Sequence, residues 1–316
     1  MSKLSPVKLL PTFKDYIWGG NKLKTIYNKK SNLDIVAESW ELSAHKDGQS
    51  IVYGGEYDSL TLTEYIDKAG SSILGTNSEK FDYFPILIKF IDAKDNLSVQ
   101  VHPNDDYALR NEGEYGKTEM WYILDCEEHS YLYYGFSKNI TKDEYKNAIK
   151  NNTLTDILNK VPVHKGDVFF IPAGTVHAIG AGIMICEIQQ NSNTTYRVYD
   201  YNRKDKNGNT RPIHIDKAID VSILTKSPDI PQINTGNDIV LAKCDYFTVR
   251  KITVDTITKI NIDSSSFHSI IIIDGSGTIT MNNDFIKFDK GDSLFIPAQD
   301  DEYIITGNCE LILSAI

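Results

Sequence analysis

The chain has 316 residues, 41% of them hydrophobic and 10% aromatic, and its 43 acidic and 33 basic side chains give a formal net charge of −10. This composition is too apolar for a disordered chain, and the length suffices for about two domains. The acidic balance argues against nucleic acid as a partner, because nucleic-acid binding needs Lys and Arg to neutralise phosphates. It is compatible with a small anionic substrate, since one local cluster of basic side chains is enough to bind it.

The sequence also bears on the compartment of the protein. No apolar run approaches the ~20 residues that a membrane-spanning helix needs, so no membrane partner is expected. The start of the chain lacks the apolar segment of a signal peptide. We therefore predict a cytoplasmic protein. We expect neither a disulfide framework nor a Cys-zinc site, because the four cysteines are far apart and form no Cys-x-x-Cys pair: Cys126, Cys186, Cys244 and Cys309.

Most of the chain is predicted to form short β-strands separated by Gly, Asn, Asp and Pro, and only a few short helices are expected. Capping boxes at Thr61/Glu64 and Thr141/Glu144 predict two helix starts, and a third helix is expected after Pro212. The predicted elements, in chain order, are a helix over 61–70, a strand over 84–91, a strand over 120–124, a helix with Tyr145, Ala148 and Ile149 on one face, a helix with Ile215, Ala218, Ile219 and Ile223 as its buried stripe, and a strand over 270–273.

A nine-residue segment occurs twice. Residues 165–173 (KGDVFFIPA) recur as residues 290–298 (KGDSLFIPA), with an offset of 125 and seven identical positions. This repeat favours a duplicated β-domain, which we divide into a domain over 1–226 with small helical additions and a domain over 227–316, with the linker over 227–237. At the offset of His177 the second copy has Glu302, so only the first domain is expected to carry a site.

Three short segments predict a metal site in the first domain. Gln100 and His102 share one face of a strand, as do Lys117 and Glu119, because side chains on a strand alternate. His177 follows a Pro-x-Gly turn. Each of these residues alone is more typical of an ordinary polar position. Together, two imidazoles, a carboxylate and an amide oxygen suit a divalent metal, with Zn²⁺ preferred and Fe²⁺ or Mn²⁺ as alternatives.

The segment Gly166-x5-Pro172-x-Gly174-x2-His177 resembles the second motif of the cupin superfamily. Nearly the whole chain is similar to one family within it, the type I mannose-6-phosphate isomerases. The segments that carry this resemblance are WGG at 18–20, ESWELSAH at 38–45, LSVQVHP at 97–103, KTEMW at 117–121 and TYRVYDYNR at 195–203. The resemblance implies a mainly β fold of two cupin-like β-barrel (jelly-roll) domains with a few short helices. The chain lacks the large helical domain of longer members and looks like the short bacterial form.

The resemblance also implies a zinc-dependent aldose–ketose isomerase that interconverts mannose 6-phosphate and fructose 6-phosphate through an enediol intermediate. It implies one Zn²⁺ per chain and a phosphosugar as the small-molecule partner, and we expect a monomer or a weak homo-oligomer. The positions that match the family's functional residues are Gln100, His102, Glu119 and His177 as metal ligands, Arg197 and Lys117 as catalytic residues, and Ser98, Lys89 and His45 as substrate-binding residues.

The sequence leaves two questions open. The catalytic base is not assigned, since His45, Lys117, a carboxylate and metal-bound water are all candidates. The same residues also fit a non-catalytic sugar-phosphate-binding or regulatory protein with a relict metal site, or a non-haem iron oxygenase. Without the resemblance, we would interpret Lys117 and Arg197 as surface charges on the rim of a barrel. Gln100 in place of a third His, together with the two basic residues, fits a phosphosugar better than an oxygenase.

Overall fold

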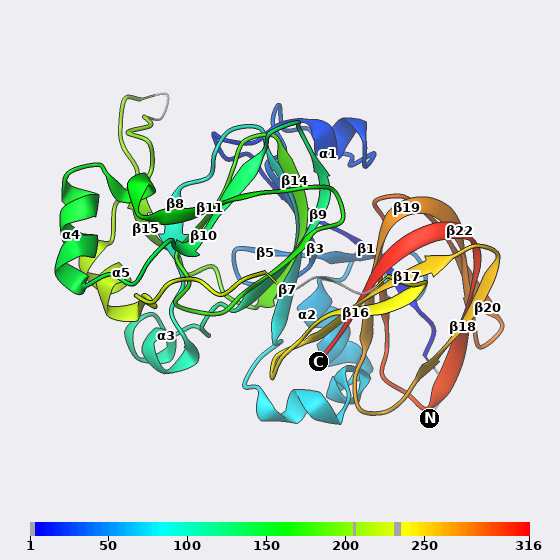
Figure 1. Cartoon of the computed structure of the whole chain (residues 1–316). Coiled ribbons are helices and arrows are strands. Elements are labelled where there is room, and N and C mark those ends of the chain that lie inside the picture. The colour runs from blue at the N-terminus through cyan, green and yellow to red at the C-terminus, as the bar shows by residue number, and fades with distance from the viewer. Residues whose placement is uncertain (1–3, 205–206, 231–234) are drawn as a thin grey trace.

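The computed structural model describes residues 4–204, 207–230 and 235–316 (Figure 1). The predicted linker over 227–237 therefore lies partly outside the described residues. Five α-helices and three short 3₁₀ helices are found in the described part of the chain. They are α1 (Lys22–Thr25), α2 (Leu62–Ala69), η1 (Ser71–Leu74), η2 (Thr76–Lys80), α3 (Asp105–Asn111), α4 (Lys142–Lys150), η3 (Leu154–Asp156) and α5 (Ile215–Val221).

The strands form three large sheets, and the strand pairs that build the first two are antiparallel. A six-stranded sheet has the order β12 (Val168–Ile171), β9 (Glu119–Cys126), β14 (Ile183–Gln190), β7 (Ile86–Ala93), β3 (Glu38–Leu42) and β2 (Thr12–Lys14). A five-stranded sheet has the order β11 (Leu158–Pro162), β10 (Tyr131–Phe136), β13 (His177–Ile179), β8 (Val99–Val101) and β15 (Tyr196–Tyr199).

The third sheet has nine strands and holds most of the C-terminal part of the chain. Its order is β16 (Asp238–Lys243), β17 (Thr248–Val254), β22 (Asp301–Ala315), β19 (His268–Met281), β21 (Ser293–Ile296), β1 (Val7–Leu10) and β6 (Ile51–Tyr53), with β18 (Ile257–Ile262) on β22 and β20 (Asp284–Asp289) on β19. A separate hairpin pairs β4 (Ala44–His45) with β5 (Gly48–Gln49). The prediction of a mainly β fold is confirmed, and its division into two jelly-roll barrels stays a prediction.

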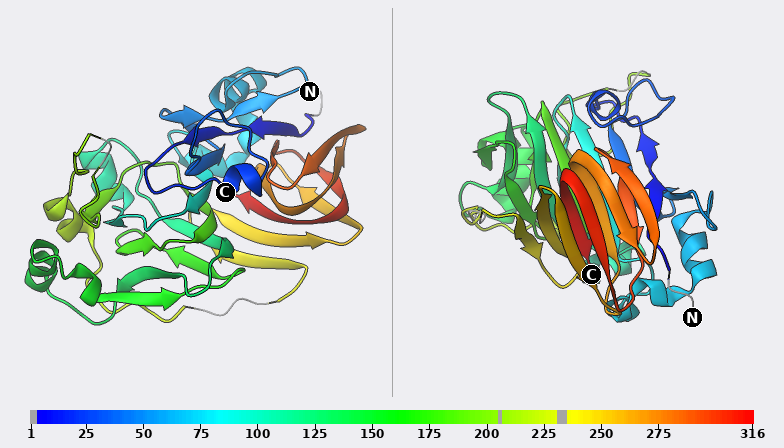
Figure 2. Two further views of the ribbon diagram at one scale, coloured as in Figure 1. Left: turned by 90° about the horizontal axis from the view of Figure 1, so that it is seen from above. Right: turned by 90° about the vertical axis from the view of Figure 1, so that its right-hand side faces the viewer.

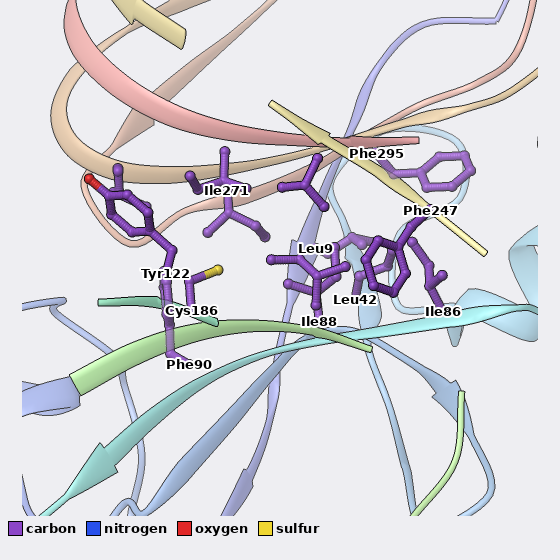
Figure 3. Packing of buried hydrophobic residues seen from close by; sticks show 14 of the residues in the cluster. Leu9, Leu42, Ile86, Ile88, Phe90, Tyr122, Cys186, Phe247, Ile271 and Phe295 are labelled. Atoms are coloured by element: carbon purple, nitrogen blue, oxygen red, sulfur yellow. The ribbon is translucent and has the colours of Figure 1, made fainter. Parts of the chain in front are cut away.

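The six-stranded sheet is buried on both faces. One face packs Trp121 and Ile185 against Leu132 and Ile179 of the five-stranded sheet. The other face contributes a row of side chains to the core shared with the nine-stranded sheet, among them Ile88, Phe90, Tyr122 and Cys186, which meet Ile271 and Phe295 (Figure 3). Because both faces are covered, all eight residues of β7 are buried, which explains the nearly unbroken apolar run over 84–91.

The first strand of the chain belongs to the sheet of its last third. β1 pairs with β21 on one side and with β6 on the other, and Figure 2 shows this blue strand beside the orange ones. The two halves are thus joined by main-chain hydrogen bonds as well as by side-chain packing. The predicted boundary at residue 226 stays a prediction, and the sheet itself continues across the two halves.

The repeated segments adopt the same turn. Gly166 and Gly291 have φ of 93° and 94°, a region that glycine enters without steric cost. Each glycine N–H donates to a main-chain carbonyl of an earlier strand, that of Ile123 in β9 or of Ile272 in β19, and the N–H groups of these two isoleucines donate to the carbonyls of Asp167 and Asp292. Each turn leads into a short strand, β12 or β21. The repeat seen in the sequence is therefore a repeat of structure.

The predicted helices form, with one correction. Thr61 and Thr141 both cap their helices and complete capping boxes with Glu64 and Glu144. Helix α5 ends at Val221, and Ile223 lies beyond it with 46% of its surface exposed. The prediction that Ile223 belongs to the buried stripe is wrong, because the backbone turns to an extended conformation at Ser222. Within the described residues, no helix is both long and apolar enough to cross a membrane.

Candidate active site

The predicted metal ligands come from three strands of the two facing sheets. Gln100 lies on β8 and His102 directly follows that strand, Glu119 opens β9, and His177 opens β13. His177 is opposite Gln100 in the pairing of β13 with β8, whereas Glu119 faces them from the six-stranded sheet. The N–H of Gly174, which has φ of 89°, donates to the His102 carbonyl at 2.8 Å. The Pro-x-Gly turn thus fixes one histidine relative to the other.

The ligand atoms of these residues converge. One ligand atom from each of His102, Glu119 and His177 lies within 4.8 Å of the other two. His102 Nε2 is 3.3 Å from Glu119 Oε1, and His177 Nε2 is 3.7 Å from Glu119 Oε2. The Gln100 amide is 3.4 Å from His177 Nε2, and turning the amide by 180° brings its oxygen to that place.

The orientation of the two imidazoles is set by main-chain carbonyls. His102 Nδ1 is 2.8 Å from the carbonyl of Thr194, and His177 Nδ1 is 2.9 Å from that of Thr175. A proton on Nδ1 donates to each carbonyl, so each Nε2 is left as a lone-pair donor toward the cluster. This is the outer-shell arrangement that metal-binding histidines commonly show. The residues present therefore fit a divalent metal.

The electrostatics of the cluster favour the same protonation state. Burial, reinforced by Lys117, lowers the pKa of His102 to about 3, and burial also lowers the pKa of His177. Burial acts to raise the pKa of Glu119, but the charge of the neighbouring Lys117 outweighs it and holds that pKa well below its usual range. Neutral imidazoles beside an ionised carboxylate are the form in which these side chains bind metal.

A cavity of about 290 Å³ lies against this cluster, at the small end of the size range of ligand pockets. Five of the predicted site residues line it: Lys89, Ser98, Gln100, Lys117 and Arg197. The Lys117 ammonium also donates a hydrogen bond to Glu119 and lies 3.2 Å from His102 Nε2. Lys117 is thus shared between the metal cluster and the cavity, and it is buried rather than a surface charge.

The sequence did not single out the two carboxylates that line the cavity, Glu38 and Glu187. They flank Lys89, whose Nζ is 3.6 Å from Glu38 and 3.5 Å from Glu187. Burial acts to lower the pKa of Lys89, but the two carboxylates raise it above its ordinary value. The sequence pattern does distinguish Glu187, since it is the one charged residue in the apolar run of β14.

Glu187 has one oxygen that accepts a hydrogen bond and one, 3.5 Å from Lys89 Nζ, that accepts none from the described residues. Trp121 Nε1 donates to Glu187 Oε1 at 2.9 Å and also to Glu119 Oε2 at 3.1 Å. Glu187 Oε2 is buried and accepts no hydrogen bond from any residue that the structure describes. Burial, together with the charge of Glu119, raises the pKa of Glu187. The tryptophan therefore links the metal cluster to a carboxylate at the cavity.

Arg197 lies on β15, opposite Gln100. Its Nε donates to Ser98 Oγ at 3.2 Å, and its Nη1 donates to the carbonyl of Pro212 at 3.1 Å. The structure thus brings Arg197, Ser98 and the predicted ligand Gln100 together at one end of the cavity. Arg211 lines the same cavity, and no local pattern in the sequence points to it.

His45 is not among the residues that line the cavity. It is buried on β4, with Nδ1 3.6 Å from Asp47 and Nε2 3.7 Å from Glu114. Burial lowers its pKa, and Glu114 opposes that effect. Its ring packs edge-to-face with that of Trp40, with 5.8 Å between the ring centroids. Its proposed role in substrate binding stays a prediction.

The second copy of the repeat does not carry an equivalent cluster. Within the described residues, the one group of three or more His, Cys, Asp or Glu side chains placed to hold a metal is that of the first copy. Glu302, at the position that matches His177, pairs with Lys259 on the exposed surface. His268 of the second half instead contacts the hydroxyl of Tyr303 at 2.9 Å.

The fold and the site together define a cupin-type protein with a candidate divalent-metal centre. Comparison with protein families matches residues 237–316 to the cupin domain of mannose-6-phosphate isomerase and residues 7–128 to the catalytic domain of type I phosphomannose isomerase. The chain is 38% identical over 322 residues to mannose-6-phosphate isomerase ManA of Bacillus subtilis (strain 168), with 98% of each chain covered.

Two further comparisons agree with this match. The mannose-6-phosphate isomerase of Streptococcus mutans is 38% identical over 302 residues, with 94% of each chain covered. The crystal structure of the mannose 6-phosphate isomerase from Bacillus subtilis has a TM-score of 0.92 to this chain and 35% identity, and covers 99% of this chain and 100% of that one. The chain belongs to the type I phosphomannose isomerase family, so the predictions of the family and of an isomerase are confirmed.

Proposed function

We propose that this chain interconverts mannose 6-phosphate and fructose 6-phosphate through an enediol intermediate, with one Zn²⁺ bound by Gln100, His102, Glu119 and His177. The observation that carries the proposal is the convergence of His102, Glu119 and His177 beside a cavity lined by Lys117 and Arg197. Nitrogen and carboxylate oxygen donors suit Zn²⁺. When bound, the metal supplies Lewis-acid stabilisation of the charge that develops on the substrate oxygens.

The basic residues of the cavity have separate tasks in this proposal. Lys117, which hydrogen-bonds to Glu119, places an ammonium group at the metal end of the cavity, where negative charge develops on the enediolate. Arg197 is held by Ser98 and by the Pro212 carbonyl, so its guanidinium is oriented before substrate binds. Preorganised charges of this kind stabilise a developing oxyanion without reorganisation during the reaction.

The free oxygen of Glu187 makes this residue the best-placed base. The reaction requires a group that removes the proton from one carbon and returns it to the neighbouring carbon. Glu187 Oε2 is free of hydrogen bonds from the described residues, and Trp121 holds the other oxygen in place. The Lys89 ammonium, 3.5 Å away, supports the carboxylate form. We assign Glu187 as the base on these contacts.

The test is a coupled assay for fructose 6-phosphate formation together with metal analysis of the same sample. Turnover of mannose 6-phosphate is expected in the native protein, loss of turnover after chelation, and recovery when Zn²⁺ is added back. Full activity in a sample shown to be free of metal would refute the metal-dependent mechanism. Binding of mannose 6-phosphate without turnover in the zinc-loaded protein would favour a sugar-phosphate-binding role instead.

A further inference from the structure

The charged side chains that line the catalytic cavity carry an excess of positive charge. The carboxylates Glu38 and Glu187 balance the ammonium groups of Lys89 and Lys117, and Arg197 and Arg211 add two further positive charges. A substrate that carries a compact anionic group is therefore expected to bind with that group at the two arginines.

Arg211 is held in place by the buried carboxylate of Asp200. Asp200 directly follows β15 and is 4% exposed. Arg211 donates from Nε to Asp200 Oδ2 at 2.8 Å and from Nη2 to Oδ1 at 2.6 Å. This two-bond geometry fixes the plane of the guanidinium. It uses two of the five N–H groups of Arg211 and leaves the Nη1 group unused by Asp200.

Asp200 does not neutralise the basic groups around it. Arg203 also donates to Asp200 Oδ1, at 2.7 Å, so one carboxylate serves two guanidinium groups. Burial acts to raise the pKa of Asp200, but the hydrogen bonds from Arg211 and Arg203 lower it, and the group is ionised at neutral pH. Because Arg203 and Asp200 do not line the cavity and their charges cancel, Arg197 and Arg211 bring two positive charges to it. The excess of two matches the charge of a phosphate monoester.

The loop that carries Arg211 is tied back to Arg197. The N–H of His214 donates to the Arg197 carbonyl at 2.8 Å, and the Arg197 N–H donates to His214 Nδ1 at 3.2 Å. Arg197 Nη1 also reaches the carbonyl of Pro212, the residue after Arg211. These contacts hold the two arginines close to each other at the cavity. Burial is the main cause that lowers the pKa of Arg197, and the positive charge of Arg211 lowers it further.

We propose that Arg211, positioned by Asp200, forms a phosphate clamp with Arg197 and determines the preference of the site for a phosphorylated sugar. This inference rests on the proposed function for the identity of the sugar, and the clamp itself requires only a phosphate group. Asp200 is a positioning residue, since it acts through Arg211. The substrate then binds with its phosphate at Arg197 and Arg211 and its reacting carbons toward Lys117 and Glu187.

The test compares Arg211→Gln and Arg211→Lys with the native protein in steady-state kinetics and in calorimetric titration with inorganic phosphate. Hydrogen bonds to a charged group predict a rise of about 10- to 100-fold in KM for mannose 6-phosphate in Arg211→Gln, with kcat changed little. The Kd for inorganic phosphate is expected to rise in the same proportion. Arg211→Lys keeps the charge but not the two-bond geometry, and it should fall between the native protein and Arg211→Gln.

A matched control is available in the second half of the molecule. Arg250 makes the same kind of two-bond contact, with Asp238, away from the residues that line the cavity, so Arg250→Gln should leave KM and phosphate binding unchanged. Asp200→Asn should raise KM as Arg211→Gln does while zinc content stays native. A fall in kcat with KM and phosphate Kd unchanged would overturn the clamp, and so would failure of the native protein to bind phosphate.

The two proposals fail in different ways. Absence of turnover by the native zinc-loaded protein would refute the isomerase proposal, and phosphate titration would still decide the clamp. Turnover by the native protein with native KM and native phosphate Kd in Arg211→Gln would refute the clamp alone. The melting temperature and zinc content of each variant show whether it is folded. If Arg211→Gln is not folded, the KM and the phosphate Kd of Arg211→Lys decide whether the clamp exists.

Discussion

Replacing Lys29 with methionine tests whether a buried ion pair locks the two halves of the molecule together. Lys29 Nζ lies 2.7 Å from both carboxylate oxygens of Glu41 and also donates to the carbonyl of Gly291, in the turn of the second repeat copy. Glu41 has no exposed surface, and Ser39 donates a further hydrogen bond to it at 2.6 Å. The pair therefore joins β3 of the six-stranded sheet to the turn before β21.

The expected cost follows from the burial of Glu41. Removing one partner of a buried ion pair leaves an uncompensated charge and typically costs about 3–5 kcal/mol in the free energy of unfolding. Burial already raises the pKa of Glu41, and Lys29 is the main group that opposes this rise. In Lys29→Met the pKa of Glu41 in the folded state rises further above its unfolded value, so stability is lost as pH increases. The loss should be larger at pH 8 than at pH 5.

The assay is urea unfolding followed by circular dichroism at both pH values. The double variant Lys29→Met/Glu41→Gln should recover most of the loss, because it removes the buried charge. As a matched control, Lys259→Met breaks a pair with Glu302 in which both side chains are about half exposed, and it should cost less than about 1 kcal/mol. A cost below 1 kcal/mol for Lys29→Met, or a double variant no more stable than the single one, would refute the reasoning.

Three further predictions concern the site and the second half. His177→Ala should lose bound zinc and lower activity by at least about 100-fold, because even outer-shell changes at metal sites cost 10- to 100-fold; metal analysis and the coupled assay check both. Glu187→Gln should keep zinc and lower kcat by about 10²- to 10⁴-fold, the usual contribution of a general base. Burial, with Arg250, lowers the pKa of His268 to about 4. The contribution of His268 to the free energy of unfolding is therefore complete above its unfolded pKa of about 6.5, and about 3 kcal/mol of it is lost as pH falls from there toward 4. In His268→Gln the free energy of unfolding should fall less over this pH range than in the native protein.

Each of these predictions has a result that contradicts it. Zinc retained at native stoichiometry in His177→Ala would remove this histidine from the ligand set. A native kcat in Glu187→Gln would return the role of base to the other candidates, among which Lys117 is the side chain that hydrogen-bonds to the metal cluster. For His268, the same dependence of unfolding free energy on pH in the native protein and in His268→Gln would show that other groups cause the acid loss.

The metal ligands could be predicted because local patterns fix them. Gln100 and His102 share a strand face, and the turn at Gly174 places His177 at the start of the next strand. The sequence also contained an unused signal at Glu187, since a lone carboxylate in a fully buried strand requires a partner or a function. The pairing of β7 with β14 places Lys89 opposite it, and this non-local register cannot be read from either segment alone.

Arg211 and the docking of the two halves depend on longer-range contacts. Arg211 lies in a polar loop, and it is brought to the cavity by its hydrogen bonds to Asp200 and by those between His214 and Arg197. In the same way, the local pattern of β1 predicts a strand but not its partner, because β1 pairs with β21 almost three hundred residues later. Strand partners that are distant in sequence are set by tertiary packing, which a single sequence does not display.

The two copies of the repeated segment show how one local structure serves two purposes. In the first copy, β12 is an edge strand that pairs only with β9, and the chain continues through Gly174 to the ligand His177. In the second copy, β21 pairs on both sides, with β19 and β1, and its Ser293 hydroxyl donates to the Glu41 carbonyl.

The surroundings of the second turn complete this contrast. The carbonyl of Gly291 accepts a hydrogen bond from Lys29, and a Cβ at this glycine would lie 2.5 Å from the carbonyl oxygen of Tyr27. The second copy is thus packed against the N-terminal half through its turn, whereas the first copy leads into the metal site. The position that matches His177 is occupied by Glu302, which is exposed beside Lys259. We infer that the second half stabilises the six-stranded sheet, whose opposite face carries the catalytic residues.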